Sequence, residues 1–143
     1  MLKGVPAILS PELLKVMMEM GHGDELVIGD GNFPAASMAR RLLRADGHGV
    51  AELLEAIMKF FPLDSFVDRP VALMQVVPGD PTKPTIWEKY RSILKSADDK
   101  FEDFELVERF AFYERAKQGY AILATGEEAL YANIILKKGV VVE

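Results

Sequence analysis

The sequence contains no cysteine, which excludes disulfide bonds, thiolate catalysis and cysteine-ligated metal sites. It has only two histidines, His22 and His48, and a single tryptophan. No apolar run approaches the ~20 residues that a membrane-spanning helix needs. The amino-terminal stretch is interrupted by Pro6 and Pro11 and has no continuous apolar core, so we expect no signal peptide. These absences predict a cytoplasmic protein without a membrane partner.

Positive charge is also sparse. The chain carries 17 Lys and Arg residues against 22 Asp and Glu residues, a net charge of −5 at pH 7. Its densest cationic spots are the pairs Arg40-Arg41 and Lys137-Lys138. Binding to a phosphate backbone needs a larger basic patch than two isolated pairs. We therefore expect no nucleic-acid partner.

Hydrophobic residues, by contrast, are abundant and make up 50% of the 143 residues. A chain of this length suffices for one domain with one core, and we assign residues 1–143 to a single domain. So high an apolar fraction in a small chain is most simply explained by apolar surface buried between subunits. The composition therefore predicts a homo-oligomer.

Helices and strands are predicted to alternate along the chain. Ser10 is a typical N-cap residue followed by Pro11, so a helix is expected to begin there, with its methionine-rich face in the core. Helical periodicity predicts further helices at 50–61, 85–97 and 109–118. Short apolar runs predict strands at 25–28, 41–44, 71–77, 104–107, 120–125 and 133–136. The alternation indicates an α/β fold, a single three-layer α/β/α domain with a central, mostly parallel or mixed sheet.

The segment Gly21 to Pro34, GHGDELVIGDGNFP, combines titratable residues with glycines around a short apolar run. His22 and Asp24 precede the predicted strand 25–28, and Asp30 follows it in a glycine turn. Titratable groups at strand ends and glycine turns are where α/β proteins usually place functional side chains. We therefore predict the active site in this segment.

The sequence lacks the residues that most kinds of catalysis need. A metal site at His22 and Asp24 has no third nitrogen or sulfur donor, and a magnesium site on Asp24 and Asp30 has no phosphate-binding loop beside it. The glycines do not form a dinucleotide fingerprint, and no G-x-S-x-G motif occurs. General acid–base catalysis by His22 remains, because an imidazole can give and take a proton near neutral pH. A purely local capping or packing role for His22 also remains open.

Four separated blocks carry a more specific pattern. They are SPELLKVMMEMGHGDELVIGDGNFPA at 10–35, RADG at 44–47, RFAFYERAK at 109–117 and ATGEEALYANIILKKGV at 124–140. In this order, they resemble the L-fucose mutarotase family, the sister of the D-ribose pyranases. The resemblance implies a ribose-pyranase-like fold and an isomerase that interconverts the α and β anomers of a free monosaccharide. It also implies that the reaction uses no metal and no cofactor.

The resemblance further implies which residues act. His22 matches the catalytic proton donor of the family. The matched sugar-binding positions are Asp30, Arg109, Tyr131, Ala132 and Asn133. Arg109 is typical of the fucose branch, whereas the ribose branch tends to have histidine, so L-fucose is the expected substrate. Without the resemblance, an ion pair with Glu105 or Glu108 is the preferred explanation of Arg109.

Two positions depart from the family pattern. Asn32 stands where some members have histidine, and Ala132 stands where several fucose-type members have glycine. Action on D-ribose as a pyranase, and a non-catalytic role as a sugar-binding accessory protein, therefore stay as alternatives. Members of the family form decameric rings with sites close to subunit interfaces, so the resemblance makes a homodecamer the expected assembly.

Overall fold

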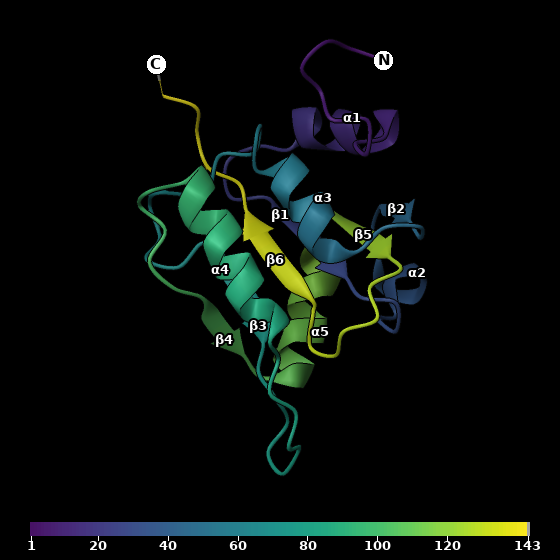
Figure 1. The fold of residues 1–143 in the computed structure, drawn as a ribbon, viewed down its shortest axis with the longest axis vertical. Helices are drawn as coiled ribbons and strands as arrows, with labels where there is room; N and C mark the ends of the chain where they lie inside the picture. The colour runs from purple at the N-terminus through teal and green to yellow at the C-terminus, as the bar shows by residue number, and fades with distance from the viewer. Residues whose placement is uncertain (143) are drawn as a thin grey trace.

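The computed structural model describes residues 1–142 and contains one six-stranded sheet with strand order β2-β5-β1-β6-β3-β4 (Figure 1). Strand β6 is antiparallel to both of its neighbours, and all other pairs are parallel. The strands are β1 (Glu25–Gly29), β2 (Leu42–Ala45), β3 (Val71–Met74), β4 (Glu105–Val107), β5 (Ala121–Thr125) and β6 (Ile134–Lys137). The helices are α1 (Pro11–Glu19), α2 (Ala35–Met38), α3 (Val50–Ile57), α4 (Ile86–Ala97) and α5 (Arg109–Gln118).

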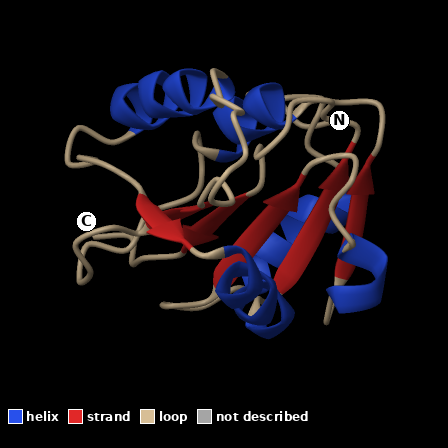
Figure 2. Ribbon diagram, turned by 90° about the horizontal axis from the view of Figure 1, so that it is seen from below, coloured by secondary structure: helices blue, strands red, loops and turns tan. Residues whose placement is uncertain are grey.

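Helices cover both faces of the sheet, so the predicted three-layer α/β architecture is confirmed (Figure 2). One core lies between the sheet and helices α1, α3 and α4, and a second lies between the sheet and helices α2 and α5. Successive residues of a strand point to opposite faces. In β1, accordingly, Leu26 and Ile28 belong to the first core and Val27 to the second. Each of the three is fully buried, which explains the continuous apolar run in this strand.

The predicted elements all occur, with shifts at their ends. Ser10 caps α1, because its hydroxyl accepts the N–H of Leu13 at 3.1 Å. Helix α3 ends at Ile57 and strand β3 at Met74, each earlier than their apolar runs predict. Among residues 1–142, no helix is long and apolar enough to cross a membrane.

One core prediction for α1 is wrong. Met17 and Met20 are buried, but the side chain of Met18 is 85% exposed. Consecutive residues of a helix point in directions about 100° apart, so Met18 cannot share the face that Met17 turns to the core. The predicted methionine-rich core face thus holds for Met17 and Met20 but not for Met18.

A buried hydrogen bond ties α4 to the segment that precedes β6. Tyr90 is fully buried, and its hydroxyl donates to the carbonyl of Ala132 at 2.7 Å. The same segment receives a second bond from α4, since Nε1 of Trp87 donates to the carbonyl of Tyr131 at 2.8 Å. Helix α4 therefore fixes the backbone at Tyr131 and Ala132.

We expect Tyr90→Phe to lower the free energy of unfolding by about 1–3 kcal/mol, because it leaves the buried carbonyl of Ala132 without a donor. Denaturant unfolding at matched protein concentration measures the change. Tyr120→Phe is the control, since the Tyr120 hydroxyl has no hydrogen-bond partner within residues 1–142, and its effect should stay below about 0.5 kcal/mol. Equal losses in the two variants would contradict the role given to the Tyr90 hydroxyl.

Candidate active site

A tight turn at the carboxyl end of β1 places Asp30. The turn is close-packed, since a Cβ on Gly29 would lie 2.8 Å from the Cβ of Phe33, too close for any side chain. Asp30 is buried, and its Oδ1 accepts the N–H of Asn32 at 3.0 Å. The carboxylate of Asp30 thus lies at the end of a parallel strand, where open α/β sheets bind their ligands.

The segment before β6 lies directly beside Asp30. The side-chain oxygen of Asn133 accepts the backbone N–H of Asp30 at 2.8 Å, and both residues are buried. Tyr131 has φ = 56°, and no other non-glycine residue among residues 1–142 has a positive φ. Such left-handed conformations are costly for bulky side chains and persist where surrounding contacts impose them, often at functional sites. Here the contacts come from α4 through the carbonyls of Tyr131 and Ala132.

Asp80, which the sequence analysis did not select, binds the hydroxyl of Tyr131. The hydroxyl donates to Oδ2 of Asp80 at 2.6 Å and accepts the N–H of Val77 at 3.3 Å. The other carboxylate oxygen of Asp80 accepts the N–H and the hydroxyl of Thr82 at 2.9 and 2.6 Å. The loop between β3 and α4 is thereby fastened to Tyr131. A weaker sequence signal did exist, because Asp80 lies in a Pro-Gly-Asp turn six residues after the end of β3, whereas Asp30 directly follows β1.

Arg109 opens helix α5 at the same end of the sheet. The ion pair with Glu105 or Glu108 that the sequence left open is absent among residues 1–142. Glu105 pairs with Arg115 at 2.8 Å, and Glu108 caps the helix by accepting a backbone N–H. The guanidinium of Arg109 instead lies near Tyr113, with Nε 3.5 Å from the hydroxyl. Its charge is therefore available to a ligand.

These groups surround one pocket of about 240 Å³. It combines carboxylate, amide, phenol and guanidinium groups with apolar side chains. Its lining residues are Asp30, Asn32, Phe33, Met74, Val77, Asp80, Arg109, Tyr113, Leu130, Tyr131 and Asn133. Four of the predicted site residues, Asp30, Arg109, Tyr131 and Asn133, meet here. The side chain of Ala132 is buried in the core below, so its contribution to the pocket is through the backbone.

The two carboxylates of this pocket have opposite electrostatic environments. Burial raises the pKa of Asp30, and backbone N–H groups of Asn32 and Ala132 offset only part of this effect. Hydrogen bonds from Thr82 and Tyr131 lower the pKa of Asp80, because they stabilise the charged form. The pocket therefore holds one carboxylate whose pKa is raised by burial and one whose pKa is lowered by hydrogen bonds.

His22 lies at the opposite end of β1, in the loop that precedes the strand. Its Nε2 is 3.0 Å from Oδ1 of Asp64, and its ring packs against Phe66 with the centroids 5.2 Å apart. The carboxylate of Asp24 forms no ion pair with His22 and instead closes the loop by accepting the N–H of Gly21 at 2.7 Å. No pattern in the sequence indicated Asp64, which lies 42 residues further along the chain.

Within one chain, therefore, the structure does not bring His22 together with the other predicted site residues. The five residues of β1 alone separate the two ends by roughly 16 Å, at about 3.3 Å per residue. The same separation rules out a shared ion between Asp24 and Asp30. No group of three or more His, Cys, Asp or Glu side chains suited to hold a metal occurs within residues 1–142.

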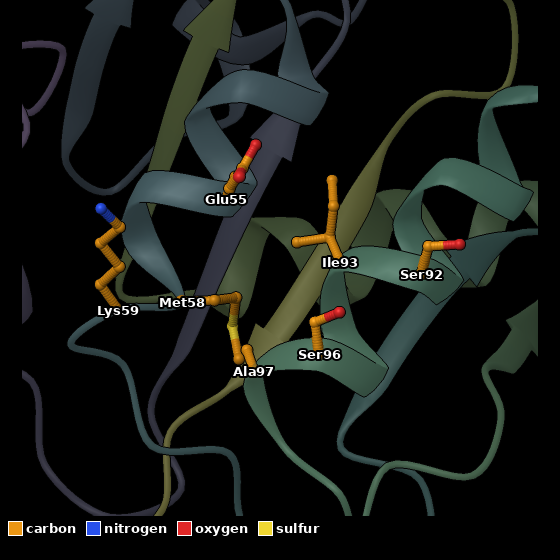
Figure 3. A pocket seen from close by; sticks show the side chains of 7 residues that line it. All are labelled: Glu55, Met58, Lys59, Ser92, Ile93, Ser96 and Ala97. Carbon is orange, nitrogen blue, oxygen red and sulfur yellow. The ribbon is translucent and has the colours of Figure 1, made fainter.

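A second cavity, a groove of about 490 Å³, lies between α3 and α4 (Figure 3). Met58, Ile93 and Ala97 form its apolar part, and its charged side chains, Glu55 and Lys59, both belong to the α3 side. None of the predicted site residues lines this groove. The polar pocket at the carboxyl end of β1 is therefore the candidate active site.

The model of the RbsD / FucU transport protein family matches residues 3–141. The chain belongs to this family. It is 54% identical to an L-fucose mutarotase of Actinobacillus pleuropneumoniae over 98% of this chain and 97% of that protein. It is 51% identical to the human fucose mutarotase over 97% of this chain and 94% of that protein.

A solved structure of a family member has the same fold as this chain. The fucose mutarotase of Streptococcus pneumoniae, crystallised in complex with L-fucose, superposes with a TM-score of 0.93 and is 52% identical. The superposition covers 99% of this chain and 100% of the other. The resemblance predicted from the four sequence blocks is thus confirmed at the level of the family and the fold.

We expect the pKa values of the two pocket carboxylates to lie on opposite sides of 3.8, the ordinary pKa of aspartate. Asp30 should titrate above it because it is buried, and Asp80 below it because it accepts three hydrogen bonds. Side-chain ¹³C NMR measures both, and the variants Asp30→Asn and Asp80→Asn assign the signals. The reverse order would contradict the environments described here.

Proposed function

We propose that this protein is an L-fucose mutarotase, an isomerase that interconverts the α and β anomers of the free sugar. The observation that carries the proposal is a small polar pocket in a chain 51–54% identical, over nearly its full length, to fucose mutarotases. The S. pneumoniae relative was crystallised with L-fucose. Residues 1–143 then form one mutarotase domain. The cytoplasmic location stays a prediction from the sequence.

The pocket offers the groups that a monosaccharide needs. Asp30 accepts hydrogen bonds from sugar hydroxyls, Arg109 donates, and the amide of Asn133 can still donate through its nitrogen while its oxygen holds Asp30. Tyr131 adds an aromatic face beside the apolar side chains of Phe33 and Leu130. This mixture of polar and apolar groups suits a 6-deoxy sugar, which has both hydroxyls and a methyl group.

Mutarotation requires two proton transfers. An acid gives a proton to the ring oxygen O5 as the C1–O5 bond breaks and its electron pair goes to O5. The proton of the O1 hydroxyl passes to a base, and the O1–H electron pair forms the C1=O1 bond of the open aldehyde. Rotation about C1–C2 and the reverse steps close the other anomer. General acid–base catalysis contributes about 10²–10⁴-fold to such a step, without a covalent intermediate.

We infer that the acid, His22, reaches the pocket from a neighbouring subunit. Support comes from the separation between His22 and the pocket within one chain. Exposed aromatic side chains beside His22 and beside the pocket give further support. Phe66 beside His22 is 75% exposed, and Phe110 next to Arg109 is 65% exposed. The carboxylates of Asp30 and Asp80 are then candidates for the base.

A contact between opposite ends of two copies is heterologous, so it must close as a ring or continue as a filament. A ring places a complete site at each of its interfaces. This geometry agrees with the decameric assembly that the sequence resemblance implies, and we propose a homodecamer.

The proposed function is tested by saturation-transfer NMR on the anomeric protons of L-fucose. We expect wild type to speed the exchange between the α and β signals and His22→Ala to lower the rate by about 10²–10⁴-fold, while L-fucose binding is largely retained. His48→Ala is the matched control and should exchange at the wild-type rate. Binding of L-fucose without any faster exchange by wild type would instead identify a sugar-binding accessory protein.

The assembly is tested separately by native mass spectrometry. We expect a single species of ten times the 15.9 kDa chain mass. Phe66→Asp should reduce the assembled fraction, because it places a charge at the proposed interface. Glu102→Asp, a conservative change at an exposed position, should leave the mass unchanged. A monomeric wild type would contradict a site completed by a second chain.

A further inference from the structure

A tight turn between β3 and α4 holds the hydroxyl of Tyr131 from two sides. Residues 77–80, Val-Pro-Gly-Asp, form this turn, since the N–H of Asp80 donates to the carbonyl of Val77 at 3.0 Å and Gly79 has φ = 90°. Proline in the second place and a left-handed glycine in the third are typical of a type II turn. The N–H of Val77 donates to the Tyr131 oxygen at 3.3 Å, and the Tyr131 hydroxyl donates to Oδ2 of Asp80 at 2.6 Å. The two ends of one turn thus clamp one phenol.

The carboxylate of Asp80 is itself held in place by Thr82. Its Oδ1 accepts the N–H and the hydroxyl of Thr82 at 2.9 and 2.6 Å, while Oδ2 accepts the hydroxyl of Tyr131. An ionised carboxylate accepts about four hydrogen bonds, and three of them are thus made within the chain. Asp80 has little capacity left for a sugar hydroxyl, so its contacts suit a role that acts through Tyr131.

The clamp determines what the phenol of Tyr131 offers to a ligand. A phenol has one proton, and an ionised carboxylate only accepts hydrogen bonds, so this proton lies toward Asp80. The hydrogen bond to Asp80 raises the pKa of Tyr131 by more than the N–H of Val77 and the positive charge of Arg109 lower it, which keeps the phenol protonated. Toward a ligand in the pocket, the oxygen of Tyr131 can therefore only accept a hydrogen bond.

The backbone of Tyr131 is held by different groups from those that hold its hydroxyl. Nε1 of Trp87 donates to the carbonyl of Tyr131, and the hydroxyl of Tyr90 donates to the carbonyl of Ala132. Both donors belong to α4, whereas the hydroxyl is held by the turn before this helix. Loss of the Asp80 carboxylate therefore leaves the backbone of Tyr131 in place but frees its hydroxyl to rotate and to donate.

We propose that Asp80 is a positioning residue of the candidate pocket: together with Val77, it clamps the hydroxyl of Tyr131 so that the phenol oxygen accepts a hydrogen bond from the sugar. This inference rests on the proposed function. In this role Asp80 acts through Tyr131 and is not the base, so Asp30 remains the carboxylate that is a candidate for the base.

The test is a double-mutant cycle in L-fucose exchange with Asp80→Asn, Tyr131→Phe and the double variant. We expect Asp80→Asn alone to lower kcat/KM about 10- to 100-fold, because an amide accepts hydrogen bonds with only one of its two terminal atoms. In Tyr131→Phe, which lacks the hydroxyl, the same change should cost less than about twofold. Asp99→Asn removes the same charge from an exposed position outside the pocket and should exchange at the wild-type rate. Full, additive losses in the double variant would overturn the inference, because Asp80 would then act on the sugar directly.

¹³C NMR of the tyrosine rings adds a readout that a purely structural role of Asp80 would not change. We expect Asp80→Asn to lower the pKa of the Tyr131 phenol, because the phenol loses a charged acceptor while the positive charge of Arg109 remains. Tyr131→Phe assigns the signal among the four tyrosines. The same phenol pKa in wild type and Asp80→Asn would contradict the clamp.

Gly79→Ala keeps the test decisive if Asp80→Asn does not fold. An added Cβ meets no atom within 4 Å, so the change strains only the left-handed backbone of the turn and leaves the carboxylate in place. It should lower kcat/KM, whereas Gly4→Ala, an equally open left-handed glycine near the amino terminus, should not. An active wild type with unchanged kcat/KM in Asp80→Asn, or in Gly79→Ala, would overturn this inference alone. A wild type that fails to speed exchange at all would remove the proposed function itself.

Discussion

The pairing of β6 between β1 and β3 is the constraint on which both halves of the proposed site depend. Immediately before this strand, Asn133 holds the backbone of Asp30 and Tyr131 holds the loop of Asp80. Immediately after it, the backbone of Lys138 holds the His22 loop. Because β6 runs antiparallel to β1 and β3, its first residue lies beside the ends of these strands and its last residue lies beside their starts. One strand thus positions both the candidate pocket and His22, the acid of the proposed mechanism.

The same arrangement explains why a single chain separates the two halves of the proposed site, the pocket and His22. The pocket has carboxylates, an amide, a phenol and a guanidinium, but no imidazole. His22 has a carboxylate beside it, with Oδ1 of Asp64 3.0 Å from its Nε2, but none of the predicted sugar-binding residues. A strand cannot bend back on itself to join its own ends, whereas a second copy placed head to tail brings the two half-sites together. In the proposed mechanism, assembly is then a condition of catalysis.

Much of the fold was predictable because interactions between residues close together in the sequence determine the helices and strands. Apolar runs marked the buried strands, and the N-cap at Ser10 marked α1. The site was predictable only in part. Asp30 was found from its place after a predicted strand, and Asn133 through resemblance. Asp64, however, meets His22 through sheet pairing across 42 residues, a contact with no local signal. The positive φ of Tyr131 likewise depends on bonds from α4. Non-local pairing, which sequence periodicity does not encode, determines these positions.

The central claim, a site shared between two chains, is tested most directly by mixing two inactive variants. His22→Ala keeps the pocket, and Asp30→Asn keeps the histidine. The two variants are dissociated, mixed in equal amounts and reassembled. The mixture should regain about a quarter of the wild-type exchange rate, because random neighbours pair an intact pocket with an intact histidine at one interface in four. Reassembled mixtures as inactive as the separate variants would contradict the account, because a site within one chain cannot be restored by mixing.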